Sequence, residues 1–338
     1  MHPLTPKRLF VISAALTGIL LLVAVFSLKF GTRSISLVEL FRILLDTSMG
    51  RSDQIDSDFR LIIFGIRLPR IILAMIVGAA LSVAGASFQA LLRNPLADPY
   101  VLGVSSGAAL GAILSLIVAA RSPGATPFAA FIGAAAASAI VYFLGRRGGS
   151  LDSFALLLGG VVTASFLSAV IMFLMTTISG RDLRGMAFWL MGDLTTSSPV
   201  PLRWLLLVLV ITVGAIYTTA ADLNLLLSGE QEAMHLGVDV ARVKLVVFLG
   251  ASVLTGLAVS VSGAIGYVGL LVPHVMRLFF GSDYRVLIPA TALGGAIAIV
   301  IADTLARTIV APTELPVGAM TAMVGAPIFI LLLRRRLS

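Results

Sequence analysis

The sequence contains no cysteine and few charged residues. Charged side chains occupy 12% of the 338 positions, whereas hydrophobic side chains occupy 59%. Soluble domains carry about a quarter charged residues, so this composition predicts a chain whose surface mostly faces lipid. Without cysteine, disulfides and thiolate metal sites are excluded. The three histidines, His2, His235 and His274, do not cluster with carboxylates in the sequence, so we expect no metal site and no cofactor.

Sequence signals for nucleotide binding and for ion-coupled transport are also missing. There is no G-x-x-x-x-G-K-[ST] motif, and therefore no phosphate-binding loop of that kind in this chain. The cores of the first seven hydrophobic segments contain no Asp, Glu, Lys or Arg, whereas proton relays need such groups inside the membrane. No residue stands out as catalytic, so we expect this chain not to be an enzyme. The basic residues lie at segment ends, which suits lipid headgroups and not nucleic acid.

Ten hydrophobic segments have about the length needed to cross a membrane, which is roughly 20 residues. The first could be a signal peptide, but its apolar core is longer than the usual ~7–15 residues. We therefore expect one all-α, polytopic membrane domain over residues 1–338, with ten transmembrane helices. The eighth segment is short and contains Pro273, which predicts a break in that helix. The segments are 9–30, 71–92, 101–120, 127–145, 155–178, 202–221, 243–262, 267–280, 286–308 and 316–333.

Two of these segments share a sequence pattern. Residues 78–86 read GAALSVAGA and residues 256–264 read GLAVSVSGA, with six of nine positions identical. The match is either a coincidence among small apolar residues or the trace of an internal repeat. The two stretches lie in segments two and seven, five crossings apart, so a repeat would run through the membrane in opposite directions.

The stretch RNPLADPYVLGVSSGAALGA, residues 93–112, ends the second segment and opens the third. Its two prolines lack backbone donors and disfavour helix at the residues before them. Asp98 is expected to cap the next helix, with Pro99 at its first position. Gly103, Gly107 and Gly111 follow at every fourth residue, a spacing that lets neighbouring helix backbones approach closely.

Three long blocks of the sequence resemble one family of membrane proteins. They are RLPRIILAMIVGAALSVAGASFQALLRNPLADPYVLGVSSGAALGA, GAIGYVGLLVPHVMRLFFGSDYR and ADTLARTIVAPTELPVGAMTAMVGAPIFILLLRR. The family is that of the FecCD permeases, the membrane subunits of bacterial ABC importers for iron–siderophores, haem and vitamin B12. The resemblance implies an inner-membrane subunit with ten spans, cytoplasmic termini and an inverted repeat of spans two to five against seven to ten. It also implies a homodimer or a related heterodimer, two cytoplasmic ATP-binding subunits and an extracytoplasmic substrate-binding protein.

The resemblance assigns roles to four groups of residues. Residues 222–242 would be a cytoplasmic coupling segment whose short helix docks on the ATPase, with Ser228 as its expected N-cap. Residues 31–60 would form an extracytoplasmic loop. The expected site residues are Gly229, Glu230, Ala233, Leu236 and Gly237 for coupling, Gly148, Gly149, Ser150 and Ser153 for a cytoplasmic gate, and Arg67, Arg70 and Arg307 for docking of the binding protein.

Each of these assignments has a simpler rival. The coupling helix could be a solvated connector, the gate loop a passive turn, and the arginines interfacial anchors. Asp303 and Arg307, four residues apart, fit a helix-surface salt bridge as well as a functional role. The 24 basic residues divide evenly between the two sides, but the short acid-free clusters Arg146–Arg147 and Arg334–Arg336 favour cytoplasmic termini, and the resemblance implies the same orientation. An ion-coupled secondary transporter working without an ATPase is the main alternative function, and a membrane-embedded enzyme is another. The substrate stays open among an iron chelate, haem and a corrinoid.

Overall fold

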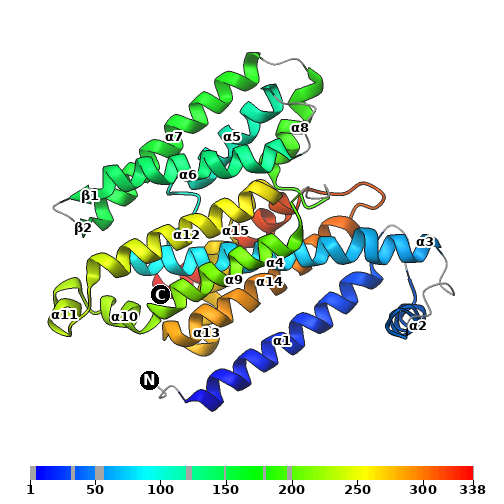
Figure 1. The fold of residues 1–338 in the computed structure, drawn as a ribbon, viewed down its shortest axis with the longest axis horizontal. Coiled ribbons are helices and arrows are strands. Elements are labelled where there is room, and N and C mark those ends of the chain that lie inside the picture. Colours follow the sequence, from blue (N-terminus) through cyan, green and yellow to red (C-terminus); the bar gives the residue numbers. More distant parts are fainter. Residues whose placement is uncertain are drawn as a thin grey trace.

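The computed structural model describes residues 5–31, 35–49, 57–118, 124–147, 150–177, 180–195 and 200–337. This part of the chain is a bundle of helices with one short hairpin (Figure 1). The elements are α1 (Pro6–Lys29), α2 (Leu37–Ser48), α3 (Ser57–Arg60), the π-helix η2 (Leu61–Arg67), α4 (Leu68–Leu91), α5 (Val104–Val118), α6 (Ala125–Gly145), β1 (Arg146–Arg147), β2 (Ser150–Leu151), α7 (Ser153–Thr177), α8 (Gly180–Met191), α9 (Leu202–Thr218), α10 (Ala220–Leu226), α11 (Glu230–His235), α12 (Val240–Ser262), α13 (Val268–Phe280), α14 (Tyr284–Thr308) and α15 (Val317–Leu337).

Six helices of the described chain are long and apolar enough to cross a bilayer. They are α1, the stretch Asp58–Leu91 that runs through η2 into α4, α6, α7, α12 and α14. α9 and α10 make a seventh span if they are joined across a bend of 50°, and α5, α13 and Val317–Leu331 of α15 are shorter apolar helices. These elements coincide with the hydrophobic segments of the sequence, which confirms a polytopic helical membrane protein. Ten crossings stay a prediction, because three helices are shorter than the roughly 20 residues of a span.

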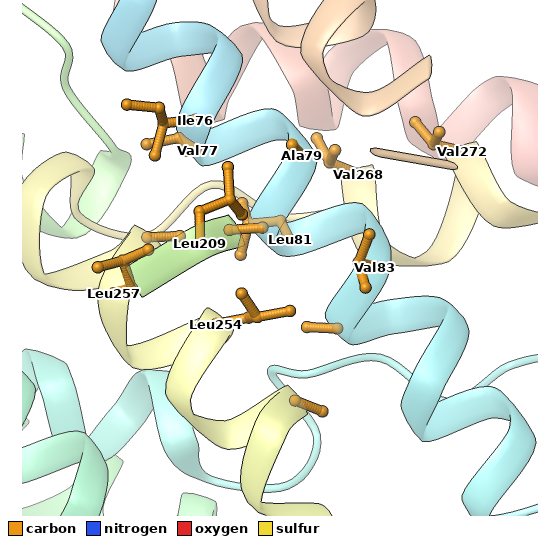
Figure 2. Close-up of a cluster of buried hydrophobic side chains, with 14 of the residues drawn as sticks. Ile76, Val77, Ala79, Leu81, Val83, Leu209, Leu254, Leu257, Val268 and Val272 are labelled. Carbon is orange, nitrogen blue, oxygen red and sulfur yellow. The ribbon is translucent and has the colours of Figure 1, made fainter. Parts of the chain in front are cut away.

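α4 lies at the centre of the bundle and α1 lies at its edge. In the most apolar window of each span, 89% of the residues are buried for α4 and only 6% for α1. Figure 2 shows Leu81 and Val83 of α4 among apolar side chains that include Leu209 of α9, Leu254 of α12 and Val268 of α13. Together with α14, these neighbouring helices bury α4 along its length, whereas most of α1 is not covered by the rest of the chain.

Glycines let α4 lie directly against two of its neighbours. A Cβ on Gly78 would collide with the backbone of Gly295 in α14, and a Cβ on Gly85 would collide with the backbone of Gly269 in α13. Gly107 and Gly111 of α5 meet the backbone of α6 in the same way, whereas Gly103, just before α5, faces α7. Lipid does not drive helices together, so close backbone approach through small residues supplies much of the association. The packing role that the sequence predicted for these glycines is confirmed.

Helix contacts occur in two matching sets. α5, α6 and α7 contact one another, and so do α13, α14 and α15. α4 packs on α13 and α14 of the second set, while α12 packs on α5 and α6 of the first. α4 and α12 also contact each other between the two sets. Exchanging α4–α7 with α12–α15 leaves these contacts unchanged, which is the arrangement expected when one four-helix unit occurs twice.

The bundle has two different ends (Figure 1). α1 begins and α15 ends at the left of the view, beside α10, α11 and the β1–β2 hairpin, and we call this the N/C end. α2 and α3 lie at the opposite end, which we call the α2 end. The first and last helices therefore share one end, as an even number of crossings requires.

The turn after α4 differs from the expectation. α5 begins at Val104 and not at Pro99. Asp98 does not cap the helix, because its carboxylate accepts the backbone N–H of Tyr100 at 2.8 Å and closes a local turn. Gly103, with a φ of +75°, ends this stretch of turns. The helix starts only where the chain leaves that conformation.

The expected break at Pro273 is also wrong. A proline in a helix leaves the carbonyl four residues earlier without its usual donor, and here that carbonyl belongs to Gly269. The side-chain Nε2 of Gln89 in α4 donates to it at 3.3 Å, so α13 continues through the proline. The chain is unwound before α13 instead, between Gly263 and Tyr267, which both have positive φ.

Candidate functional site

The segment formed by α10 and α11 is attached to α14 on one side. Asn224 of α10 donates from Nδ2 to the Asp283 carboxylate at 2.8 Å, and its Oδ1 accepts the backbone N–H of Tyr284 at 2.9 Å. Hydrogen bonds from Arg285, helped by Asn224, lower the pKa of Asp283 to about 2 against the opposing effect of burial. Asp283 is therefore ionised at any physiological pH, and it holds α10 at the start of α14.

α11 has the shape of a short, sharply bounded helix. It follows Gly229, which is its N-cap in place of the expected Ser228. It ends in a Schellman motif, in which the N–H of Gly237 donates to Met234 and the N–H of Val238 donates to Ala233, both at 3.0 Å. Gly237 has a φ of +87°, a conformation that favours glycine.

One side of α11 packs on the bundle and the other side is exposed. Ala233 is completely buried, whereas Met234 is 54% exposed and Leu236 is 65% exposed. Two apolar side chains thus form the exposed tip of a polar segment. A short helix of this kind can enter a groove on another protein, because its tip is apolar and its backbone turns are rigid.

Glu230 connects α11 to two other parts of the chain. Arg93, in the turn after α4, donates to Oε1 at 2.9 Å, and Lys244 of α12 donates to Oε2 at 2.7 Å. Lys244 also donates to the backbone carbonyl of Leu151 in β2 at 2.6 Å. Lys244 is only 2% exposed, so its ammonium is removed from water and held by these two partners. The turn after α4, α11, α12 and the hairpin meet at this point.

The hairpin lies directly beside this cluster. β1 pairs with β2 in antiparallel register, Arg146 opposite Leu151. Ser150 is exposed, and Ser153 at the start of α7 donates from Oγ to the carbonyl of Leu91 at 3.0 Å. Gly148 and Gly149, the other two expected gate residues, lie outside the described residues. The described half of the expected gate is thus held next to the expected coupling helix.

The three arginines expected to dock a binding protein lie together at the α2 end. Arg70 of α4 holds Asp303 of α14 at 2.8 Å and Glu314 at 2.7 Å. Arg307 holds the same Asp303 at 3.2 Å, and Arg67 donates to the backbone carbonyl of Leu28 at 2.6 Å. Two possibilities for Asp303 and Arg307 were left open, and the structure excludes a helix-surface pair, because both side chains are buried.

These arginines are used inside the chain. Arg67, Arg70 and Arg307 are 5%, 9% and 4% exposed. Arg307 also donates to the hydroxyl of Ser27 in α1 at 2.7 Å. The cluster therefore joins α1, α4 and α14. Docking of a binding protein by these arginines stays a prediction. Because the three side chains are buried, they could not reach out from the surface to contact such a partner.

Sequence reasoning missed Lys244 and Arg93 as partners of Glu230. Lys244 is the second residue of the hydrophobic segment 243–262, and it is one of only three lysines in the chain. A lone lysine within an apolar helix signals a buried partner, because an isolated ammonium is costly away from water. The described residues hold no group of three or more His, Asp or Glu side chains that could bind a metal ion.

The apolar faces of the long helices, with charges gathered at the two ends, define a polytopic helical membrane protein. Residues 19–335 match the FecCD transport family, and the chain belongs to that family. This confirms the resemblance seen in three sequence blocks.

Several relatives are close enough to compare over most of their length. The chain is 45% identical over 277 residues to a cobalamin import system permease protein of Halobacterium salinarum, which covers 82% of this chain and 74% of the relative. It is 41% identical over 325 residues to a hemin transport system permease protein of Yersinia pestis, covering 94% of each. A solved structure described as an inward-facing metal-chelate type ABC transporter matches with a TM-score of 0.81 and 31% identity, over 97% of this chain and 99% of that one.

Proposed function

We propose that this chain is the membrane-spanning permease subunit of an ATP-binding-cassette importer. The observation that carries the proposal is the family match over residues 19–335, with relatives named as permeases of cobalamin and hemin import. Such a subunit forms the pathway and leaves ATP hydrolysis to a separate chain. The absence of a phosphate-binding loop motif in the sequence agrees with that division of labour.

The proposed topology has ten crossings and an inverted repeat of α4–α7 against α12–α15. Its support is the matching set of helix contacts and the five crossings that separate the two repeated sequence stretches. We place the N/C end in the cytoplasm and residues 31–60, with α2, on the other side of an inner membrane. Residues 222–242 then face the cytoplasm, where an ATPase would be found.

The proposed partners follow from this topology. A second copy of the chain would complete the pathway, and two ATP-binding subunits would dock on the exposed tips of the two α11 helices. Met234 and Leu236 supply the apolar contact, and Gly229 and Gly237 make the turns that set the helix in place. The hairpin and Ser153 would form part of the cytoplasmic gate beside α11.

A substrate-binding protein would dock at the α2 end. The arginine cluster there places three guanidiniums against two carboxylates, which leaves one excess positive charge. Fields of this kind mainly raise the association rate and make it depend on salt. We therefore propose that Arg67, Arg70 and Arg307 assist docking through their charge.

The proposed substrate is a large metal-containing ligand: an iron chelate, haem or a corrinoid. The names of the relatives support this class and leave the member open. The ion-coupled carrier is not favoured, because the buried and partly buried ion pairs described above lie at the two ends and not along the middle of the described helices.

Reconstitution of purified components tests the proposal. Proteoliposomes would contain this chain with its ATPase, and binding protein would be added outside with cyanocobalamin, haem or a ferric siderophore. We expect uptake of one of these ligands only when ATP is enclosed and all subunits are present. Uptake driven by an ion gradient through this chain alone would identify the carrier and overturn the proposal.

A further inference from the structure

We propose that Lys244 is a positioning residue that transmits movement of the coupling helix α11 to the gate hairpin β1–β2. The inference rests on the proposed function and deepens it, because it names the side chain that joins the two expected sites. The one ammonium group of Lys244 holds the Glu230 carboxylate at the start of α11 and the Leu151 carbonyl in β2.

Burial makes this connection stiff. Lys244 is 2% exposed, so an ammonium that lost either partner would remain in an apolar region without compensation. Leu151 is also buried, which prevents water from replacing Lys244 at its carbonyl without a rearrangement. If an ATPase displaces α11, keeping both Lys244 contacts costs less free energy than breaking one of them. α12 and the hairpin then move with α11.

Two helices hold β2 at neighbouring positions. In the described part of the hairpin, the strands form the pairs Arg146–Leu151 and Arg147–Ser150. Lys244 of α12 holds the Leu151 carbonyl, and two residues further along Ser153, at the start of α7, donates to the Leu91 carbonyl of α4. A displacement carried by Lys244 therefore acts on β2 beside a point that α4 holds. Relative movement of these two attachment points changes the direction of the hairpin.

Arg93 provides an internal contrast, since it binds the same carboxylate from a different setting. Its side chain is 40% exposed, compared with 2% for Lys244. Exposed ion pairs contribute little, whereas breaking a buried pair by removing one partner is strongly unfavourable. We therefore expect Lys244 and not Arg93 to carry the mechanical connection.

The first experiment measures transport per ATP hydrolysed in the reconstituted complex. The variants are Lys244→Met, Lys244→Arg and Arg93→Met, and the control is Lys29→Met, the same change at the α2 end. With whichever of cyanocobalamin, haem or ferric siderophore the wild type imports, we expect Lys244→Met to keep ATP hydrolysis but lower import per ATP by about tenfold. Lys244→Arg is expected to restore much of the ratio, and Arg93→Met and Lys29→Met to leave it near that of the wild type.

The second experiment needs neither ATPase nor substrate. Because the chain has no cysteine, spin labels attach only to introduced cysteines, here in place of Ser150 in the hairpin and Met234 in α11. In the wild-type background we expect a narrow distance distribution between the two labels, because α11 and the hairpin move as one unit. With Lys244→Met the distribution is expected to broaden, and Lys29→Met is expected to leave it unchanged.

The outcomes separate the two levels of the proposal. An unchanged transport ratio in Lys244→Met, or an unchanged label distribution, would overturn the role of Lys244 while leaving the importer assignment intact. A wild-type complex that imports none of the three ligands with ATP would overturn the proposed function instead. If Lys244→Met fails to assemble with the ATPase, the label distribution in the isolated permease still decides the inference.

Discussion

Both ends of the bundle contain ion pairs with buried side chains, but the pairs connect different elements. At the α2 end Arg70, Asp303 and Arg307 are all buried, whereas at the N/C end Lys244 is buried and Glu230 is 28% exposed. At the α2 end, Arg70, Asp303 and Arg307 join spanning helices to one another. At the N/C end, Glu230 and Lys244 join a short non-spanning helix to a hairpin and to the start of a span. The first arrangement keeps the bundle closed. In the proposed mechanism the second arrangement connects parts that a partner protein moves, so similar ion pairs would serve rigidity at one end and transmission at the other.

Removing Asp303 gives the largest expected effect. Asp303→Asn leaves two buried guanidiniums without their shared counter-charge, and breaking such a buried pair costs about 3–5 kcal/mol. We expect the purified protein to aggregate or to lose much of its thermal stability, as measured by size-exclusion chromatography and by Tm in detergent. The matched control is Asp46→Asn, which removes the partner of Arg42, an arginine whose side chain is 81% exposed. Equal stability of the two variants would show that the α2-end cluster does not hold the helices together.

A bulky residue at Gly237 is expected to affect transport more than stability. Gly237→Val forces a β-branched residue into positive φ, which costs about 1–3 kcal/mol and disturbs the end of α11. ATP-driven uptake should fall strongly, while the isolated permease stays folded by size-exclusion chromatography.

The control for that prediction is another glycine in open space. Gly281, in the turn between α13 and α14, has a φ of +92° and, like Gly237, no neighbour where a Cβ would lie. Gly281→Val therefore imposes the same backbone strain outside the coupling segment. If both variants lose uptake equally, the effect comes from strain in general and the special role of α11 is wrong.

Replacing arginine by lysine at the α2 end distinguishes a structural role of Arg307 from a direct role in docking the binding protein. Arg307→Lys keeps the charge but loses the fork of donors that binds Asp303 and Ser27. We expect a lower Tm, from a loss of about 1–2 kcal/mol, with an unchanged association rate of the binding protein at low salt. A slower rate at low salt, with a difference from the wild type that shrinks at high salt, would mean that the guanidinium itself contacts the partner. An unchanged Tm would contradict the structural role.

The smallest effect concerns Asp283 at the N/C end. Its pKa of about 2 lies below the value of 3.8 for a free carboxyl, so its contribution to stability is complete above pH 4. That contribution is lost as the pH falls toward 2. The difference in Tm between wild type and Asp283→Asn should therefore be a few degrees or less at pH 6, because the pair is partly exposed, and should shrink in acid. A difference that grows in acid would show that Asp283 is not the group involved.

The positions of the long helices follow from local sequence. Hydrophobic length and the spacing of small residues predicted α4, α6, α7, α12 and α14 to within a few residues, because both properties act over one helix. Local capping rules failed at Asp98, whose carboxylate closes a turn with Tyr100. The rule that a proline breaks a helix failed at Pro273, where the side chain of Gln89 in α4 replaces the missing backbone donor. In the second case the deciding partner lies 180 residues away in the chain.

Composition and three sequence blocks were enough to recognise a helical membrane protein and its family. Hydrophobicity is read residue by residue, and a motif keeps its letters wherever the chain folds. The meeting of distant charges required the folded chain. Lys244 and Leu151 are 93 residues apart, and Arg70 and Asp303 are 233 residues apart. In the sequence, Lys244, Arg70 and Asp303 each look like a charged residue at the end of a membrane span. Helix packing then removes their side chains from water. A charged side chain that is buried needs an ion-pair or hydrogen-bond partner, because leaving it unpaired away from water is strongly unfavourable.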